Sequence, residues 1–396
     1  MSLNRTFTRR QVLKLGTSAL ILSGCRTLLD QLTALSPTST PSSSPLSPTA
    51  TAGATPSRSV VATPTMPPIP TAAPSPIDTP QPTATPVTPR WVAPKNGSKL
   101  GLHVTFGPRD GLDDCLARCA QSGHPVAVVK CVDDFEAAFK AKQYSPQTLT
   151  VGRVNGVGLN NHDFVDMQAW EPPEFSPAIG VTYTTAQDAA RVYYDLVKPT
   201  WKLNPVIDVW ETFNEFSYHW GWQADFYLAL MDLAEADGYR LGLWSQSAGN
   251  PPEDAYPDIA RVCRRAKEHG NHILCLHEYG LDGLLRDAPK NLVTRYRKVY
   301  QYLATGDAEI PLVISEAGEN AGGGFTGIET FMDDFTWYDR QLSKDAYVIG
   351  CAMWTLGDWE GANFQAALPY LAAYISGQPI ALSKTYLPLV ANDSSH

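Results

Sequence analysis

Two glutamates at the ends of apolar runs are the residues of this chain best placed to do chemistry together. Glu215 ends the stretch PVIDVWETFNE (205–215), directly after Asn214, and Glu316 stands in the stretch PLVISEAG (311–318). Two carboxyl groups that face each other across a bond can divide the work of breaking it. One protonates a leaving oxygen while the other attacks or activates water. The two glutamates are far apart in sequence, so the fold must bring them together.

The chain alternates apolar, strand-like runs with amphipathic, helix-like runs. The strand candidates cover residues 100–106, 125–132, 148–154, 205–213, 240–247, 272–279, 311–317 and 347–356. Continuous apolar strands that alternate with helices are typical of a parallel sheet covered by helices. Polar residues follow nearly every strand, and no glycine-rich phosphate-binding turn follows the first one, which favours a closed barrel over an open sheet. We therefore predict an α/β fold, a (β/α)8 TIM barrel over residues 93–380.

Four short motifs stand at the ends of the fourth, sixth, seventh and eighth strand candidates: WETFNE, LHEY, VISEAG and AMWTLGDW. Over about residues 95–377 this set resembles the large clan of retaining (β/α)8 glycoside hydrolases, which includes cellulases, mannanases, xylanases and β-glucosidases. The clan's signature is an Asn-Glu pair after strand four and a nucleophilic Glu after strand seven. Phe216 departs from the pattern, because many members have Pro at that position. The resemblance therefore indicates the clan and no single family within it.

The resemblance implies a division of roles between the two glutamates. Glu215 would be the acid/base and Glu316 the nucleophile, while Asn214 would hydrogen-bond the sugar 2-hydroxyl, a contact that strengthens in the transition state. Glu215 must then be protonated near neutral pH while Glu316 is ionised. Repulsion between the two carboxylates and hydrogen bonds donated to Glu316 would separate their pKa values.

Further residues at the strand ends are implied to line the same site. His277 would lie beside the acid/base, Tyr279 would donate to the nucleophile, and Trp354 would form the floor under the sugar that is cleaved. His103 and Arg153 end the first and third strand candidates. For each of these two, a contact with sugar and support of the barrel mouth are equally open.

Other polar residues near the strand ends have structural explanations. Glu211 is interpreted as an inward-facing structural carboxylate, and Glu278 is expected to point toward the helices because it alternates with its neighbours along the strand. Lys130 is a weaker candidate for a sugar contact. The aromatic loop 218–222 is explained by loop packing as well as by sugar subsites, and residues 358–360 could line the cleft.

The N-terminal segment predicts export. TRRQVLKLG (8–16) resembles a bacterial twin-arginine signal. The apolar stretch after it, residues 15–24, is shorter than the roughly 20 residues of a membrane-spanning helix. LSGC (22–25) resembles a lipobox, in which Cys25 would become the lipidated first residue of the mature chain. The alternative is a plain secretory signal with an incidental cysteine. We expect an exported protein, lipid-anchored at the outer face of a bacterial membrane or secreted.

The composition divides the chain and limits its partners. Residues 1–25 are assigned to the export signal, 26–92 to a disordered linker rich in Pro, Thr and Ser, and 381–396 to a tail. The net charge of −9, with both signs interspersed in the second half, argues against a nucleic-acid groove and an anionic-lipid patch. Membrane contact is thus expected only through lipid. The cysteines lack zinc-ribbon spacing. We expect no metal and no cofactor. The oligomeric state and the disulfide pairing remain unassigned.

These observations favour a retaining glycoside hydrolase that cleaves β-glycosidic bonds of an extracellular poly- or oligosaccharide. Two alternatives stay open. One is a non-catalytic carbohydrate-binding surface protein on the same barrel, because a fold does not fix a function. The other is a peptidoglycan hydrolase, which only the surface tether favours. A retaining site requires carboxyl groups about 5–5.5 Å apart, whereas an inverting site requires about 6.5–9.5 Å.

Overall fold

The computed structural model describes residues 91–155, 183–357 and 361–380 of the 396-residue chain. The predicted export signal with Cys25, nearly all of the predicted linker, residues 358–360 and the tail lie outside the described residues. Trp91, next to last in the predicted linker, donates its indole N–H to Asp333 at 2.7 Å and so belongs with the barrel. Within the described ranges, no helix is long and apolar enough to cross a membrane.

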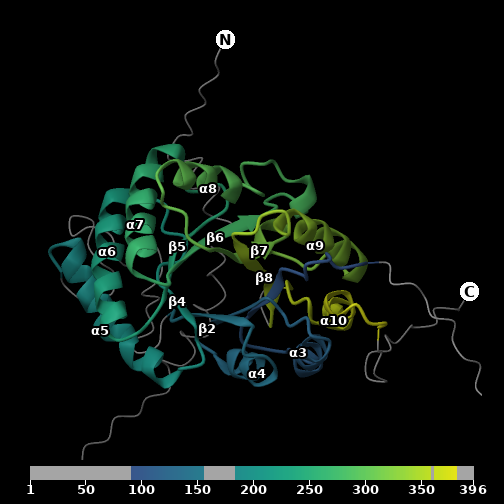
Figure 1. Cartoon of the computed structure of the whole chain (residues 1–396). Helices are drawn as coiled ribbons and strands as arrows, with labels where there is room; N and C mark the ends of the chain where they lie inside the picture. Colours follow the sequence, from purple (N-terminus) through teal and green to yellow (C-terminus); the bar gives the residue numbers. More distant parts are fainter. Residues whose placement is uncertain (1–90, 156–182, 358–360, 381–396) are drawn as a thin grey trace, which may run out of the picture. The chain divides into compact units, whose positions relative to one another are not determined.

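The strands form a closed parallel barrel in chain order, which confirms the predicted architecture (Figure 1). They are β1 (Leu100–Val104), β2 (Val128–Val132), β3 (Leu149–Arg153), β4 (Val209–Glu211), β5 (Leu241–Gln246), β6 (Ile273–Tyr279), β7 (Leu312–Gly318) and β8 (Val348–Leu356). Each strand pairs with the next, and β8 closes the barrel on β1. The largest difference from prediction is at β4, which has three residues. Pro205 has no N–H for a strand ladder and lies in a turn, so the strand begins only at Val209.

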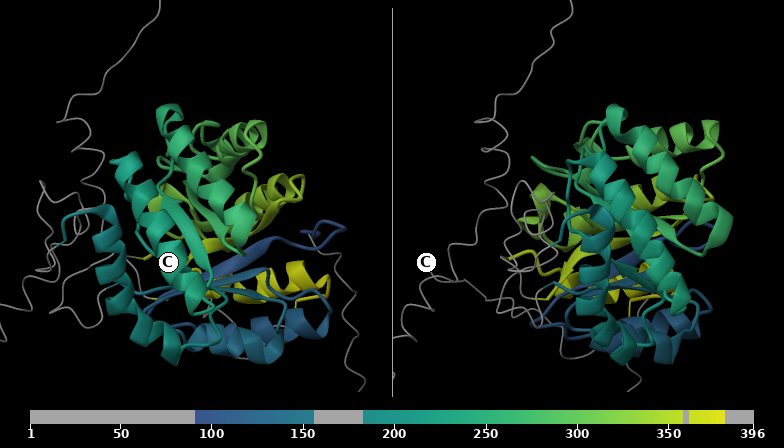
Figure 2. Two further views of the ribbon diagram at one scale, coloured as in Figure 1. Left: turned by 60° about the vertical axis from the view of Figure 1, so that its left-hand side comes forward. Right: turned by 90° about the vertical axis from the view of Figure 1, so that its left-hand side faces the viewer.

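Helices form the outer layer around the strands (Figure 2), and short 3-10 turns lie in the connections. The helices are α3 (Leu112–Gln121), α4 (Glu136–Tyr144), α5 (Ala186–Leu203), α6 (Trp220–Ala236), α7 (Tyr256–His269), α8 (Tyr296–Thr305), α9 (Ile328–Leu342) and α10 (Leu368–Ser376). The 3-10 turns are η3 (Glu253–Ala255), η4 (Leu285–Asp287), η5 (Asn320–Gly322) and η6 (Gln365–Ala367). In α7 the buried residues Ile259, Val262, Cys263 and Ala266 follow helical spacing, which gives the helix one apolar face toward the strands.

The barrel interior changes from apolar to polar along the strands. At its lower level, small apolar side chains from several strands form a plug: Val128, Val151, Val209, Ile273, Cys275, Val313 and Ala352. Because side chains alternate along a strand, the residue two positions later points inward again. On β2, β3 and β4 those next residues are Lys130, Arg153 and Glu211, all buried. A layer of charged side chains therefore lies above the apolar plug, on the side of the barrel mouth, where the strands end.

All six cysteines of the described residues are buried and unpaired. They are Cys115, Cys119, Cys131, Cys263, Cys275 and Cys351. Burial raises the pKa of Cys131 and of Cys263 to about 12, so both are thiols at neutral pH. They behave as small apolar side chains of the core.

Candidate active site

Glu215 lies in a strained loop just beyond β4. Its φ angle of 58° is in the left-handed region, which costs a residue other than glycine about 1–2 kcal/mol. The backbone N–H of Glu215 donates to the carbonyl of Ser245 at the end of β5 (3.0 Å) and so holds this conformation. Its side chain is 27% exposed and thus accessible at the barrel mouth. Backbone strain of this kind is typical of functional sites.

Glu316 lies deeper, with its side chain 6% exposed, and is held by side chains from three other strands. Lys130 Nζ donates to Oε1 at 3.0 Å, and Arg153 Nη1 donates to the same oxygen at 3.2 Å. The hydroxyl of Tyr279 donates to Oε2 at 2.9 Å. His277 Nδ1 lies 3.4 Å from Oε2. The carboxylate is therefore fixed through both of its oxygens.

This setting keeps Glu316 ionised. Burial opposes the negative charge, but His277, Lys130, His103 and Arg153 around the carboxylate outweigh burial and hold its pKa well below the usual value. A buried carboxylate that stays charged at neutral pH is available as a nucleophile.

His277 lies between the two glutamates. Its Nδ1 is 3.0 Å from Glu215 Oε1, and one oxygen of Glu215 lies within 4.8 Å of one oxygen of Glu316. The fold thus brings together the two carboxylates that the sequence singled out. The same three side chains could in principle ligate a metal ion. Lys130 and Arg153 already neutralise Glu316, which makes it a poor ligand for a cation, and we assign no metal site here.

Whether a strand side chain points into the barrel or toward the helices decides which side chains reach the site. His277 and Tyr279 share the inward direction of Ile273 and Cys275, as strict alternation predicts. Glu316 would share the outward direction of Ile314 if β7 were regular. The register of β7 against β8 shifts between Ile314 and Ala317, and such an irregularity turns a side chain to the other face.

Glu211 is buried below Glu316 and faces inward, as predicted from the sequence. Its Oε2 lies 2.7 Å from Lys130 Nζ and 3.9 Å from Arg153 Nη1. The contact with Lys130 is an ion pair between two fully buried side chains. Burial would raise the pKa of Glu211, but Lys130, Arg153 and His277 lower it to about 2. Lys130, expected from the sequence to be a weaker candidate for a sugar contact, pairs with both Glu211 and Glu316. A lysine in an apolar strand requires a buried carboxylate partner, and this signal was present in the sequence.

His103 and Arg153 both support the site from beneath its exposed surface. His103 is fully buried, with its ring 4.5 Å from the Trp354 ring and its Nε2 3.6 Å from Glu316 Oε1. Burial lowers the pKa of His103 to about 4, so it is neutral at neutral pH. Arg153 is 5% exposed, and its Nη1 also donates to the Asn214 amide oxygen at 2.5 Å. Burial therefore favours support over direct sugar contact for both residues.

Trp354 lies on β8, and its indole N–H donates to the carbonyl of Gly322 in η5 at 3.1 Å. The peptide bond that follows Trp354 is cis. Gly318, at the end of β7, permits a close approach at this point. A Cβ there would lie 2.6 Å from the Tyr279 ring and 3.4 Å from Trp354 Cβ.

Glu278 points away from the site toward the helices, as alternation predicts. Its carboxylate accepts hydrogen bonds from the Tyr338 hydroxyl (2.7 Å) and from the backbone N–H groups of Thr294 (2.8 Å) and Tyr296 (3.2 Å). Burial raises the pKa of Glu278 to about 7. The residue fixes the segment before α8 and takes no part in the site.

The loop after Glu215 is held by two buried glutamines that no sequence pattern indicated. Gln223 and Gln246 are fully buried, and the side-chain amide of each donates to the carbonyl of Phe216 at 2.8 and 2.9 Å. Phe216 itself is fully buried against Phe213 and Tyr218 (ring centroids 5.2 and 4.9 Å apart). Loop packing thus explains the aromatic residues at 218–222, which also contact the core.

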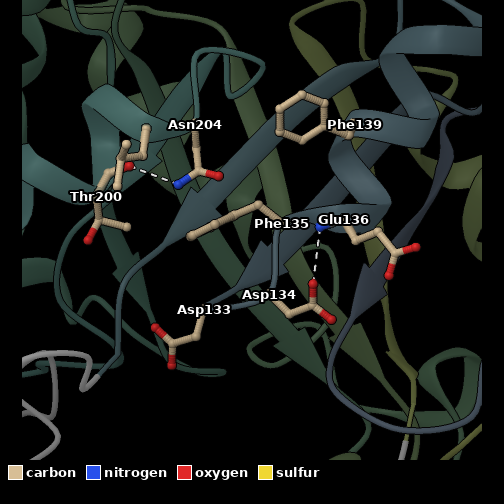
Figure 3. A pocket seen from close by; sticks show the side chains of 8 residues that line it. Asp133, Asp134, Phe135, Glu136, Phe139, Thr200 and Asn204 are labelled. Atoms are coloured by element: carbon tan, nitrogen blue, oxygen red, sulfur yellow. Dashed lines mark hydrogen bonds between the residues drawn. The ribbon is translucent and has the colours of Figure 1, made fainter. Parts of the chain in front are cut away.

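A cavity of about 550 Å³ lies away from these residues, beside the start of α4 and the end of α5 (Figure 3). Phe135, Phe139 and Leu203 supply its apolar lining, and acidic side chains at 133, 134 and 136 lie beside them. None of its lining residues belongs to the site at the barrel mouth.

A scan with models of protein families finds no match, and a sequence search of curated proteins finds none either. Solved structures give distant likenesses. A mannanase catalytic domain from Streptomyces sp. SirexAA-E has 16% sequence identity and a TM-score of 0.36, over 70% of this chain and 84% of that one. An endo-β-1,4-mannanase from Thermotoga petrophila has 11% sequence identity and a TM-score of 0.41, over 73% of this chain and 79% of that one. An endoxylanase from Clostridium papyrosolvens has 11% sequence identity and a TM-score of 0.40, over 72% of this chain and 74% of that one. These likenesses are remote.

Proposed function

We propose that the protein is a retaining β-glycoside hydrolase, with Glu316 as the nucleophile and Glu215 as the acid/base. The observation that carries the proposal is the separation of the two carboxylates, an oxygen of one lying within 4.8 Å of an oxygen of the other. Retaining glycosidases have carboxyl groups about 5–5.5 Å apart, whereas inverting ones need about 6.5–9.5 Å to admit a water molecule between them.

The environments of the two residues match these roles. Glu316 is buried and charged, as a nucleophile must be, while Glu215 is partly open to solvent and can exchange protons. In the first half of the reaction, a Glu316 oxygen attacks the anomeric carbon, the glycosidic C–O bond breaks, and Glu215 gives its proton to the leaving oxygen. In the second half, water attacks the same carbon, Glu215 accepts the proton of that water, and the bond to Glu316 breaks.

Neighbouring residues would orient the sugar. Because Asn214 Oδ1 accepts from Arg153, the donor that Asn214 would offer to a sugar 2-hydroxyl is Nδ2. That contact would strengthen in the transition state. Trp354, anchored through its indole N–H on Gly322, would lie under the ring of the bound sugar.

The substrate class we propose is an extracellular β-linked poly- or oligosaccharide, which the export signal predicted for residues 1–25 supports. The mature chain would carry lipid on Cys25 at the outer face of a bacterial membrane. Membrane fractionation of the full chain and of Cys25→Ser tests this placement. Equal membrane association of both proteins would contradict lipid anchoring.

Hydrolysis of a panel of β-linked polysaccharides and aryl β-glycosides by the full chain tests the activity. Proton NMR of the first product formed should show the anomeric configuration of the substrate. Glu316→Gly should abolish turnover, and azide should restore it with a glycosyl azide of inverted configuration. Glu215→Gly should spare aryl glycosides whose leaving group needs no protonation. Glu268→Ala, at an exposed position of α7, is the matched control and should behave as wild type.

Three outcomes would contradict the proposal. An inverted product from the unmodified enzyme would refute retention. Full activity of Glu316→Gly would refute the glycosidase assignment. Saturable binding of a polysaccharide without hydrolysis anywhere in the panel would favour a carbohydrate-binding protein instead.

A further inference from the structure

Lys130 lies between two buried carboxylates. Its Nζ is 2.7 Å from Glu211 Oε2 and 3.0 Å from Glu316 Oε1. The side chains of Lys130 and Glu211 are fully buried, and that of Glu316 is 6% exposed. Only Glu316 is needed for nucleophilic attack, so a second buried carboxylate beside the same lysine requires its own explanation. Burying an additional charge is costly unless it is paired.

The two oxygens of Glu316 are held differently. Oε1 receives both cations, Lys130 at 3.0 Å and Arg153 at 3.2 Å. Oε2 receives the Tyr279 hydroxyl at 2.9 Å and lies on the side of His277, which also contacts Glu215. Charge-assisted hydrogen bonds draw electron density toward the oxygen that accepts them. Oε1 is thus the anchored oxygen, and Oε2 faces the acid/base.

We propose that Lys130, held by Glu211, is a positioning residue that anchors Oε1 of Glu316 and leaves Oε2 as the atom that attacks the sugar. This inference rests on the function proposed above. In the first half of the reaction, Oε2 forms the bond to the anomeric carbon, and Oε1 becomes the carbonyl oxygen of the glycosyl ester. In the second half, the bond between the anomeric carbon and Oε2 breaks, and its electron pair returns to the carboxylate.

The glycosyl ester explains why Glu211 is needed. Once Glu316 is esterified it carries no charge, so Lys130 loses one of its two counter-ions. A buried lysine without a counter-ion favours its neutral form. Glu211 is not modified during the reaction, so Lys130 keeps one buried carboxylate partner and stays at Oε1. The ammonium group is then in place when the second half regenerates the Glu316 carboxylate as leaving group.

Four variants of the full chain separate this role from a merely structural one. Lys130→Met removes the anchor, Glu211→Gln removes only the spare counter-ion, and the double variant removes both charges without leaving an unpaired one. Lys142→Met is the matched control. Lys142 pairs with Asp208, 2.5 Å away at the start of β4, at the opposite end of the barrel.

The first measurement needs no turnover. Carboxyl ¹³C NMR follows the titration of Glu316, assigned by the loss of its signal in Glu316→Gln. An opposite charge at hydrogen-bonding distance lowers a carboxyl pKa by about 1–3 units. The pKa of Glu316 should therefore rise by about that much in Lys130→Met. It should not rise in Glu211→Gln, where an anion is lost and the cation stays, nor in the control. An unchanged Glu316 titration in both Lys130→Met and the double variant would overturn the proposal.

The second measurement follows the covalent intermediate. With an aryl β-glycoside that has a good leaving group, intact-protein mass spectrometry gives the fraction of glycosyl enzyme in the steady state. Lys130→Met and Glu211→Gln should both increase that fraction, with kcat and KM falling together by about tenfold, because the second half slows. A fall in kcat at unchanged KM and without accumulation, in both variants, would overturn the proposal. If the wild type neither turns over nor becomes labelled, the proposed function fails, and the NMR titration still decides whether Lys130 anchors Glu316.

Discussion

Tyr279→Phe is expected to move the ionisation of Glu316 while leaving the barrel intact. The change removes the hydroxyl that donates to Glu316 Oε2 at 2.9 Å and keeps the aromatic ring, which is 7% exposed. A hydrogen bond to a charged group contributes about 1.5–3 kcal/mol. One pKa unit corresponds to about 1.36 kcal/mol, so the pKa of Glu316 should rise by about 1–2 units.

The sign of the effect on stability follows from the depressed pKa of Glu316. A carboxylate with a depressed pKa stabilises the fold above its unfolded-state pKa, and this contribution is lost as pH falls through the folded-state pKa. Tyr279→Phe should therefore lower the free energy of unfolding at neutral pH by up to the same 1.5–3 kcal/mol or so. The difference from wild type should shrink as the solution is acidified.

The pH dependence of kcat/KM on an aryl β-glycoside measures the change directly. The acid limb reports the ionisation of the nucleophile in the free enzyme and should move to higher pH by about 1–2 units. Tyr302→Phe is the control, because Tyr302 is 38% exposed on α8, and it should leave the limb in place. An unmoved limb in Tyr279→Phe, or an equal shift in Tyr302→Phe, would show that the hydroxyl does not stabilise the Glu316 anion.

Other predictions follow from single features of the site and its surroundings. Glu215→Asn should raise the free energy of unfolding by about 1 kcal/mol, because Asn tolerates the left-handed conformation at φ 58°. It should also abolish hydrolysis of substrates whose leaving group needs protonation. Calorimetry checks the gain in stability, and a lower melting temperature would contradict it. Gly318→Ala should cost about 1–3 kcal/mol and reduce kcat, because its Cβ would lie 2.6 Å from the Tyr279 ring. A Cβ at Gly324 would have no atom within 4 Å, so Gly324→Ala should change neither the free energy of unfolding nor kcat. Burial raises the pKa of Glu278 to about 7, so the stability it contributes should be full below about pH 4.5 and decline as pH rises through 7. Urea denaturation of wild type and Glu278→Gln at pH 5 and pH 8 should show this decline only in wild type.

Two regular patterns made the fold and part of the site predictable: strands alternate with helices along the chain, and side chains alternate in direction along each strand. His277, Glu278 and Tyr279 occupy the directions that period two assigns to them, because β6 is regular through these residues. The parallel strands likewise follow from eight apolar runs between amphipathic ones, and the polar residues at the strand ends favoured closure of the barrel. The same rule would have turned Glu316 toward the helices. Its inward direction depends on an irregular register between β7 and β8, which neither strand encodes alone.

The charged layer was harder to predict, since it is assembled from residues far apart in sequence. Lys130 acquires its position from Glu211 on β4 and Glu316 on β7, and only closure of the barrel brings the three together. The burial of His103 on β1 depends similarly on Trp354 of β8, which is distant in sequence and becomes a neighbour when the barrel closes. Lipidation of Cys25 and the export signal stay predictions.

The buried thiols determine where this barrel can fold and how it withstands oxidants. None of the six cysteines of the described residues takes part in a disulfide. Disulfide formation among them therefore contributes nothing to the free energy of unfolding. Oxidants and metals react with the thiolate form, and burial raises the pKa of Cys131 and Cys263 to about 12, which keeps these two protonated. The barrel can therefore reach the same folded state in a reducing cytoplasm as in the oxidising medium outside a cell, and neither medium should alter its melting temperature.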